Sequence, residues 1–172
     1  MSKVLIVVDY QIDFVNGALG FPGAENIESE IISLVKEFKE NGETVIFTKD
    51  THFAEYLNTV EGKNLPVKHC IKGTEGHNLT PNLEKEVDNC RVFEKETFPS
   101  LELGNYLKEL NPSEIYLCGL VSDICVFTNS IIAKAACPNA EIYLCSKASD
   151  SYDHDMQEKA YDVLRHLHIH VI

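Results

Sequence analysis

Short, continuous apolar runs recur along the chain and are separated by segments with helical periodicity. Four of them are prominent: Lys3–Val8 (KVLIVV), Thr44–Thr48 (TVIFT), Glu114–Cys118 (EIYLC) and Glu141–Cys145 (EIYLC). A strand that is apolar on both faces is typical of a parallel sheet with helices packed on each side. These runs therefore predict an α/β fold.

Amphipathic segments lie between the apolar runs. Helices are predicted over Ile27–Glu40, Leu103–Leu110, Asp123–Ala136 and Asp155–His166, and two further strands over Arg91–Glu94 and His168–Ile172. The stretch Phe53–Thr80 is expected to be irregular, which in a compact domain usually indicates a functional or flexible loop. The alternation predicts a three-layer, doubly wound, mostly parallel sheet with helices on both faces, in a single domain over 1–172.

The chain is strongly acidic. Its 172 residues include 27 acidic and 15 basic side chains, which gives a formal net charge of −12. Nucleic acids and anionic membranes bind basic surfaces, so neither is expected as a partner. No basic leader precedes the first strand, and no apolar run approaches the length of a membrane span. We therefore expect a cytoplasmic protein.

Six cysteines occur, and none of them forms a C-x-x-C pair. This spacing argues against a cysteine zinc site. Thiols stay reduced in the cytosol, so disulfides are not expected, and most of the cysteines are interpreted as small core residues.

Reactive residue types follow several of the predicted strands. Asp9, Asp50 and the turn 119–125 come directly after apolar runs, and Lys95 follows Arg91–Glu94. Ligand sites in parallel α/β sheets lie beyond the carboxyl ends of the strands, so these residues are expected at one edge. Neither a G-x-G-x-x-G motif after a strand nor a P-loop is present, which argues against nucleotide binding.

Each of these residues has two interpretations. A cysteine near a helix N-terminus, such as Cys125, has its thiolate favoured by the helix dipole, and the free N–H groups there can bind an oxyanion. From position alone, however, a buried helix cysteine is the commoner explanation. Asp9 is either a turn-capping acid or a general base. Lys95 is either a solvated surface residue or a charge that lowers the pKa of a neighbouring thiol.

A second group of side chains follows the second strand. Asp50, His52, Glu61 and His69 offer two carboxylates and two imidazoles, a donor set that suits zinc, iron or manganese. The spacing of these residues is loose, so the number of donors does not by itself establish a metal site.

Five segments occur together in a recognisable order: V-D-Y-Q-I-D-F (Val8–Phe14), T-K-D-T-H (Thr48–His52), H-C-I-K-G-T-E-G (His69–Gly76), F-E-K-E-T-F (Phe93–Phe98) and G-L-V-S-D-I-C-V (Gly119–Val126). With these segments the chain resembles the isochorismatase-like cysteine hydrolases, and within them the nicotinamidase/pyrazinamidase group. The likeness runs essentially end to end.

The resemblance implies a catalytic triad and an oxyanion hole. Asp9, Lys95 and Cys125 match the triad of the family, with Cys125 as the nucleophile. The family also has a cis peptide bond that matches Leu120–Val121 here. The backbone N–H groups of Val121 and Cys125 would then form the oxyanion hole.

The same resemblance implies one divalent metal ion beside the nucleophile and no organic cofactor. Asp50, His52 and His69 match the usual ligands of this metal. Glu61 is chosen as the fourth ligand, with Asn58 as the alternative. Zinc is expected first, and iron or manganese are the alternatives.

The substrate pocket departs from the family pattern. Phe14, Tyr56 and Leu120 are expected to contact the substrate. Many nicotinamidases have an aromatic residue in a W-P-x-H-like run, but the matching run 65–69 (LPVKH) has none. This departure leaves the exact substrate open.

The activity implied by the resemblance is hydrolysis of nicotinamide and pyrazinamide-like aromatic amides to the acid and ammonia, through a cysteine thioester. Such a reaction belongs to NAD salvage and pyridine nucleotide biosynthesis. Two alternatives stay open. Sister hydrolases act on isochorismate, carbamoyl or ureido compounds, but they generally lack the Asp-x-His…His set. A non-catalytic binding protein on the same fold would not be expected to keep the whole triad. The expected partner is a small aromatic amide, and a homo-oligomer is expected only by analogy.

Overall fold

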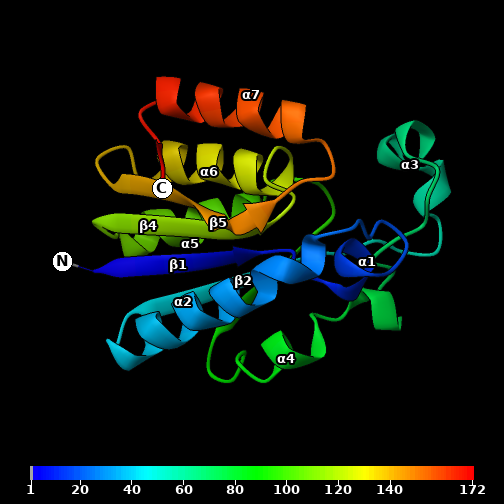
Figure 1. Ribbon diagram of the computed structural model, residues 1–172, viewed down its shortest axis with the longest axis horizontal. Coiled ribbons are helices and arrows are strands. Elements are labelled where there is room, and N and C mark those ends of the chain that lie inside the picture. Colours follow the sequence, from blue (N-terminus) through cyan, green and yellow to red (C-terminus); the bar gives the residue numbers. More distant parts are fainter. Residues whose placement is uncertain (1) are drawn as a thin grey trace.

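The strands of the central sheet all run parallel, in the order β3-β2-β1-β4-β5-β6. The computed structural model describes residues 2–172. In this part of the chain the strands are β1 (Lys3–Val8), β2 (Thr44–Asp50), β3 (Arg91–Lys95), β4 (Glu114–Leu120), β5 (Glu141–Asp150) and β6 (His170–Val171). The predicted parallel α/β sheet is therefore confirmed (Figure 1).

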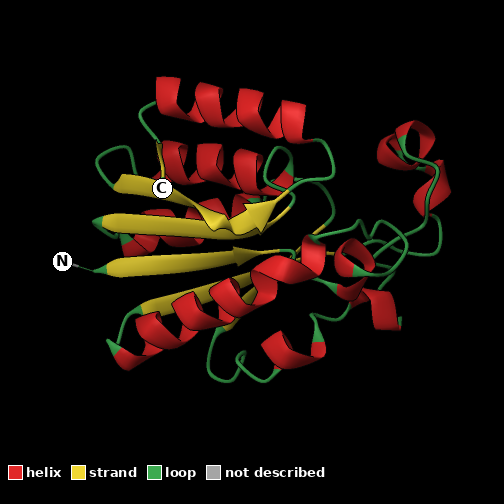
Figure 2. Cartoon of the chain, viewed as in Figure 1, coloured by secondary structure: helices red, strands yellow, loops and turns green. Residues whose placement is uncertain are grey.

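Helices cover both faces of this sheet (Figure 2). The α-helices are α1 (Ile12–Val15), α2 (Glu28–Glu40), α3 (Val60–Asn64), α4 (Pro81–Glu84), α5 (Leu101–Leu110), α6 (Cys125–Ala136) and α7 (His154–His166). Three short 3-10 helices are η1 (Ala24–Ile27), η2 (Tyr56–Asn58) and η3 (Glu75–His77). Helices α5, α6 and α7 pack on one face, and α2 and α4 pack on the other.

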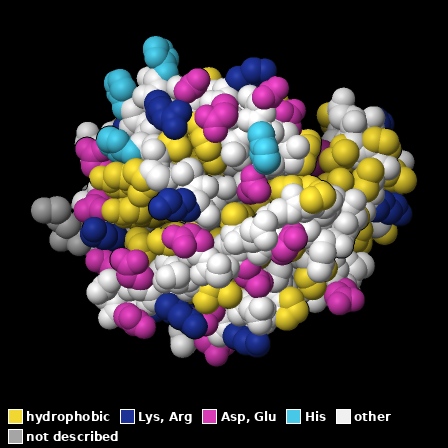
Figure 3. Space-filling view, in the orientation of Figure 1, with side chains coloured by type: hydrophobic (Ala, Val, Ile, Leu, Met, Phe, Trp, Pro, Cys, Tyr) yellow, Lys and Arg dark blue, Asp and Glu magenta, His cyan; other side chains and the backbone are white. Residues whose placement is uncertain are grey.

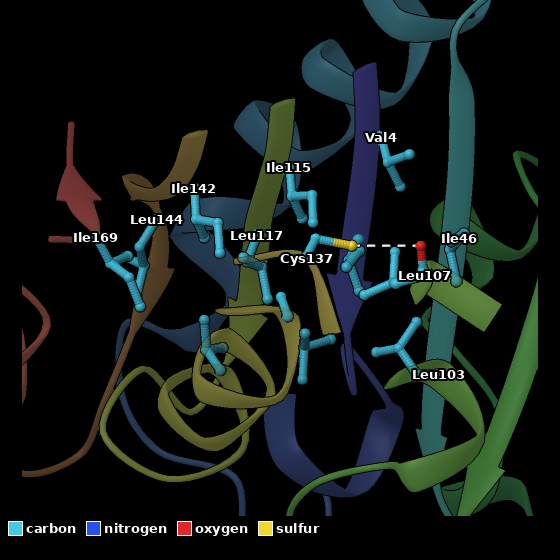
Figure 4. Packing of buried hydrophobic residues seen from close by; sticks show 14 of the residues in the cluster. Val4, Ile46, Leu103, Leu107, Ile115, Leu117, Cys137, Ile142, Leu144 and Ile169 are labelled. Atoms are coloured by element: carbon cyan, nitrogen blue, oxygen red, sulfur yellow. Dashed lines mark hydrogen bonds between the residues drawn. The ribbon is translucent and has the colours of Figure 1, made fainter. Parts of the chain in front are cut away.

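The alternation of side chains along β1 divides the core into two layers. Val4, Ile6 and Val8 point toward α5, α6 and α7, whereas Leu5 and Val7 point toward α2. All five side chains are fully buried. Figure 4 shows the first layer, in which residues of β1, β2, β4 and β5 meet those of α5 and α6. A strand buried on both faces explains why the β1 sequence is continuously apolar.

Several element boundaries differ from the predicted ones. Strand β2 continues to Asp50 and β5 to Asp150, and β5 pairs with β4 again after a register shift between Leu117 and Gly119. Helix α6 begins at Cys125, two residues later than predicted, because residues 121–124 form a turn. The last predicted strand, His168–Ile172, is reduced to His170–Val171, since the left-handed φ of 61° at His168 is incompatible with a strand.

The stretch Phe53–Thr80, predicted as irregular, contains the short helices η2, α3 and η3. It is also tied to the sheet edge by isolated bridges from His52 to Ile71 and from Gln11 to Leu79. Local hydrogen bonding therefore gives this stretch a defined path that its composition did not predict. Helix α3 projects from the end of the molecule toward which the strands point (Figure 1).

The cysteines, all within the described residues, are free thiols, and every one except Cys90 is buried. Most of them fill the core, as predicted. Cys137, for example, lies between α5 and α6 with its Sγ 3.3 Å from the carbonyl oxygen of Leu107 (Figure 4). Among residues 2–172, no helix combines the length and the apolar character required to cross a membrane.

Candidate active site

The strand order reverses between β1 and β4, so the sheet has its switch point there. Successive strands lead outward from β1 to β2 and β3, and from β4 to β5 and β6. Parallel sheets bind ligands beyond the carboxyl ends of the strands at such a point. Asp9 follows β1, Asp50 ends β2, Lys95 ends β3, and the turn before Cys125 follows β4. The four residues therefore meet at one edge, as predicted.

The ammonium group of Lys95 lies at the centre of this group. Its Nζ is 2.5 Å from Asp9 Oδ2, 3.4 Å from Asp50 Oδ1 and 3.7 Å from Cys125 Sγ. All four side chains are buried, with at most 5% of each residue exposed. The structure therefore favours a buried charged cluster. It favours this over a solvated surface position for Lys95 and over a turn-capping role for Asp9.

Asp9 leaves the sheet in the left-handed region, with φ of 47°. Its carboxylate accepts a hydrogen bond from the hydroxyl of Thr48, at 2.6 Å, and makes the ion pair with Lys95. Burial raises the pKa of Asp9, although the charge of Lys95 opposes this effect. A carboxylate with a raised pKa is a stronger proton acceptor than an exposed one.

The pKa of the Cys125 thiol is raised well above its ordinary value, chiefly by burial. The charge of Lys95 lowers this pKa, as predicted, but it does not outweigh desolvation. Burial therefore outweighs the charge of Lys95, and the net shift of the thiol pKa is upward. Burial also opposes the charge on Lys95, yet the neighbouring carboxylates and thiol raise the pKa of its ammonium group. In the resting site Lys95 carries the proton, and so does Cys125.

The turn between β4 and α6 contains the cis peptide bond Leu120–Val121, which the resemblance predicted. Gly119 precedes it with φ of 111°, and a Cβ atom there would lie 2.0 Å from the carbonyl oxygen of Val8. The N–H groups of Ile124 and Val126 both donate to the carbonyl of Val121. Among the described residues, no backbone hydrogen bond of this turn uses the N–H of Val121 or Cys125, so both are available to an oxyanion.

A compact cluster of potential metal donors lies beside this turn. One donor atom from each of Asp50, His52, Glu61 and His69 lies within 4.8 Å of the others. His52 Nε2 is 3.0 Å from Asp50 Oδ2 and 3.4 Å from Glu61 Oε1. His69 Nε2 is 3.3 Å and 3.7 Å from the same two oxygens. The stretch from Asp50 to His69 thus folds so that the four predicted donors lie together.

The surroundings of the donors fit a divalent cation. His69 Nδ1 lies 2.8 Å from the carbonyl oxygen of Val67, so this nitrogen holds the proton and Nε2 faces the cluster with its lone pair. The two carboxylates raise the pKa of His52 to about 9, against the effect of burial. Glu61 is set in place because Thr59 caps α3 through a 3.0 Å bond from Gly62 N. Asn58, the alternative ligand, is exposed in η2.

A pocket of about 410 Å³ opens beside the thiol and the donor cluster. Cys125, Val121 and Ile124 line one part of it, and Asp50, Glu61 and His69 line another. The rest of the wall is mostly apolar and consists of Phe14, Ala18, Leu19, Gly20, Phe21, Leu65, Phe98 and Tyr152. The reactive thiol and the possible metal donors therefore face one cavity.

The predicted substrate contacts are only partly correct. Phe14 lines the pocket, with its ring centroid 5.6 Å from that of His69. Tyr56, only 1% exposed, lies against the rings of His52 and His69 and donates its hydroxyl to Leu65 O at 2.9 Å. It therefore supports the donor cluster instead of lining the pocket.

Leu120 is fully buried in the core layer on the α2 side and does not line the pocket either. Three aromatic lining residues were not predicted. Phe98 ends a segment used for the resemblance, so its position could have been inferred. Phe21 and Tyr152 meet edge to face at 6.2 Å across segments distant in sequence, which no local pattern indicates.

Residues 3–172 match the family described as the Isochorismatase domain. The chain belongs to the isochorismatase family. It is 36% identical over 146 residues to the uncharacterized isochorismatase family protein PncA of Bacillus subtilis (strain 168), covering 77% of this chain and 79% of that protein. It shares 31% identity and a TM-score of 0.86 with the crystal structure of nicotinamidase PncA from Bacillus subtilis, over 99% of both chains.

A further solved structure confirms the fold of this isochorismatase-family chain. The pyrazinamidase of Pyrococcus horikoshii, solved in complex with zinc, has a TM-score of 0.87 and 24% identity, over 100% of this chain and 99% of that one. These similarities confirm the predicted resemblance to the nicotinamidase and pyrazinamidase group.

Proposed function

We propose that the chain is a single-domain cysteine amidase that hydrolyses nicotinamide and pyrazinamide-like aromatic amides to the acid and ammonia. One observation carries the proposal: Cys125 and the donor cluster of Asp50, Glu61 and His69 line the same largely apolar pocket. Such a pocket can bind a flat ring while its amide carbon lies at the thiol. Similarity to a nicotinamidase from Bacillus subtilis supports the choice of substrate.

The first half of the proposed reaction forms the thioester. Asp9 takes the proton from Cys125, and the ammonium of Lys95 stabilises the resulting thiolate. The thiolate attacks the amide carbonyl, and the N–H groups of Val121 and Cys125 bind the oxyanion. Each such donor typically lowers the activation barrier by about 3 kcal/mol. Asp9 then gives its proton to the departing ammonia.

The second half of the reaction releases the acid. A water molecule enters the position that ammonia has left and loses its proton to Asp9. The oxygen attacks the thioester carbon, and the same two N–H groups again bind the oxyanion. Collapse of this intermediate breaks the carbon–sulfur bond, and the proton held by Asp9 returns to Cys125. Lys95 stays protonated throughout, because its carboxylate neighbours raise its pKa.

The proposal includes one divalent metal ion and no organic cofactor. Asp50, His52, Glu61 and His69 would hold this ion, with zinc as the first candidate and iron or manganese as alternatives. Bound there, the metal would supply a Lewis-acid anchor for the ring nitrogen of the substrate and thereby orient its amide group.

The pocket favours this reaction over that of sister hydrolases. Among the described residues that line it, none is Lys or Arg, whereas Asp50 and Glu61 are acidic. Isochorismate and N-carbamoyl amino acids carry carboxylates, for which this lining offers no basic side chain as a partner. On the face shown in Figure 3, acidic and basic side chains are interspersed, without a broad basic surface. We accordingly propose a neutral small-molecule partner and a cytoplasmic role in NAD salvage, with no nucleic-acid or membrane partner.

An ammonia-release assay tests the proposal. The purified protein is given nicotinamide, pyrazinamide and a panel of carbamoyl and ureido compounds, and isochorismate is tested separately by pyruvate release. The Cys125→Ala variant and a chelated sample are the controls. We expect release from nicotinamide and pyrazinamide that both controls abolish. Nicotinamide turnover that survives complete metal removal would refute the metal role. Absence of product from every compound would favour a non-catalytic protein.

A further inference from the structure

Gln11 and Asp13 of the V-D-Y-Q-I-D-F segment have no part in the proposed reaction. Asp9 is the proposed base and Phe14 lines the pocket, but Gln11 and Asp13 face neither the thiol nor the cavity. We propose that Gln11 and Asp13 are positioning residues that fix Asp50 and His69 in the geometry needed to bind a divalent metal. This inference rests on the metal site of the proposed function.

Gln11 binds the backbone of Asp50 on both sides. Its Nε2 donates to the carbonyl oxygen of Asp50 at 2.9 Å, and its Oε1 accepts from the Asp50 N–H at 2.7 Å. The same Nε2 donates to the carbonyl oxygen of His77 at 2.9 Å. Gln11 is fully buried, so water cannot replace these bonds.

The geometry of β1 explains why a side chain is needed there. Strand β1 pairs with β2 up to Val8 and Thr48, and the Asp9 N–H still reaches the carbonyl of Thr48. Asp9 then turns out of the sheet with a positive φ, so β1 has no backbone left to pair with Asp50. The carboxamide of Gln11 supplies both hydrogen bonds that a continued strand would have supplied. Gln11 therefore fixes the backbone position of Asp50, from which the carboxylate extends to the donor cluster.

Asp13 acts on the segment that carries His69. Its Oδ2 accepts from the backbone N–H of Cys70 at 2.7 Å, and its Oδ1 accepts from that of Ala18 at 3.1 Å. The 69–76 segment approaches this carboxylate so closely that a Cβ atom on Gly76 would lie 2.2 Å from Asp13 Oδ2. The carboxylate of Asp13 is thus enclosed between α1 and the segment that follows His69.

The bond to Cys70 connects both histidines of the donor cluster. Cys70 directly follows His69, and its carbonyl oxygen accepts from the N–H of His52 at 3.0 Å. Cys70 also has a left-handed φ of 46°, a conformation that a non-glycine residue keeps only where its neighbours hold it. Asp13 therefore holds Cys70, whose backbone connects His69 to His52. In this way it fixes the distance between the two histidines.

A purely structural role predicts something different from a positioning role. If Gln11 and Asp13 only stabilise the fold, their loss lowers the unfolding temperature and leaves the metal affinity of the folded protein intact. If they position the ligands, the affinity falls even in the folded protein. Outer-shell groups of metal sites typically contribute about 10–100-fold to affinity.

The test compares the Gln11→Met and Asp13→Asn variants with the wild type. Gln11→Met keeps the length of the side chain and removes all three hydrogen bonds, while Asp13→Asn keeps the shape and loses one of two acceptor oxygens. Zn²⁺ affinity is measured by competition with a chromophoric chelator, the absorption spectrum of the Co²⁺-loaded protein reports ligand geometry, and thermal unfolding is recorded without metal. Asp162→Asn, on an exposed side chain, matches the Asp13 change, and Ile142→Val provides a mild core destabilisation remote from the site.

We expect Zn²⁺ affinity to fall about 10–100-fold in Gln11→Met and in Asp13→Asn, with an altered Co²⁺ spectrum, and to stay unchanged in both controls. Affinity and spectrum equal to the wild type in either folded variant would overturn the role of that residue. If Gln11→Met does not fold, Asp13→Asn still decides the test for the His69 side.

The outcome is separable from that of the proposed function. A wild-type protein that binds Zn²⁺ without hydrolysing nicotinamide would refute the amidase proposal, and loss of affinity in the variants would still support the positioning role. A wild-type protein that hydrolyses nicotinamide without binding either metal would overturn the positioning inference and leave the amidase proposal in place.

Discussion

The carboxylate of Asp50 reaches Lys95 with one oxygen and the two clustered histidines with the other. Its Oδ1 lies 3.4 Å from Lys95 Nζ, and its Oδ2 lies 3.0 Å from His52 Nε2 and 3.3 Å from His69 Nε2. Burial opposes ionisation, but Lys95 and the hydrogen bond from His52 hold the pKa of Asp50 well below its ordinary value. One ionised side chain therefore links the proposed metal site to Lys95, which in turn contacts the proposed nucleophile Cys125.

Replacing Cys125 by Ala should abolish amide hydrolysis and leave the fold intact. The thiol is the only proposed nucleophile at the pocket, so we expect kcat to fall by several orders of magnitude. The matched control is Cys118→Ala, which removes a buried thiol from the core layer on the α2 side. Initial rates of ammonia release and circular dichroism check both variants. Substantial turnover by Cys125→Ala would identify another nucleophile.

Replacing Lys95 by Met should destabilise the protein strongly, because Asp9 would then lie buried without a counter-ion and Asp50 would lose one of its charged partners. We expect the free energy of unfolding to fall by about 3–5 kcal/mol. Lys72→Met breaks the ion pair with Glu94, whose partners are 51% and 41% exposed, and should cost at most about 1 kcal/mol. Urea denaturation of the two variants measures the difference. Equal losses would show that the Lys95 contacts contribute no more than a surface pair.

The rate at which iodoacetamide modifies Cys125 should rise with pH. Burial holds the pKa of this thiol well above its ordinary value, so the thiol form dominates at neutral pH. Below its pKa the thiolate fraction increases about tenfold per pH unit, and the alkylation rate should follow it. Mass-spectrometric peptide mapping separates Cys125 from the partly exposed Cys90. A rate that is already constant near neutral pH would mean that the thiolate exists in the resting site.

Glu61 and Asn58 can be distinguished as metal ligands by substitution. Glu61 Oε1 lies 3.4 Å from His52 Nε2 and belongs to the donor cluster, whereas Asn58 is exposed. Glu61→Ala should weaken Zn²⁺ binding at least about tenfold, and Asn58→Ala should leave it unchanged. Chelator competition provides the affinities. Weaker binding only in Asn58→Ala would place the fourth ligand in η2.

Phe14 should contribute to substrate binding through its ring. It lines the pocket beside His69, where an aromatic substrate can contact its face. Phe14→Ala should raise KM for nicotinamide about 2–10-fold, since one aromatic contact contributes about 0.5–1.5 kcal/mol. Val92→Ala, at a 37% exposed position on β3 outside this pocket, is the control. An unchanged KM in Phe14→Ala would assign ring binding to Phe21, Phe98 or Tyr152.

Much of the fold could be predicted because the signals are local. A strand covered on both faces requires an apolar run, and the right-handed crossing from strand to strand requires a helix between them. The positions of Asp9, Asp50 and Lys95 at the ends of such runs then predict that they share an edge. The motif order, together with Cys125 and the two histidines, predicted the residues of both clusters before any distance was known.

Only the tertiary structure decided how deeply each side chain is buried and in which direction it points. Tyr56 lies against the rings of His52 and His69, and Leu120 packs in the core with residues distant in sequence, so neither lines the pocket. Likewise, Glu61 reaches the cluster because a capped helical turn directs it there.

The identity of the thiol at Cys125 could be read from the chain, but its protonation could not. The sequence by itself determined the apolar runs that form strands and the reactive residues that follow them. It also determined the family to which those residues point. Only the tertiary structure decided that the Cys125 pKa is raised and which side chains face the pocket. The physical reason is that desolvation depends on all the atoms packed around a group, most of which come from other parts of the chain.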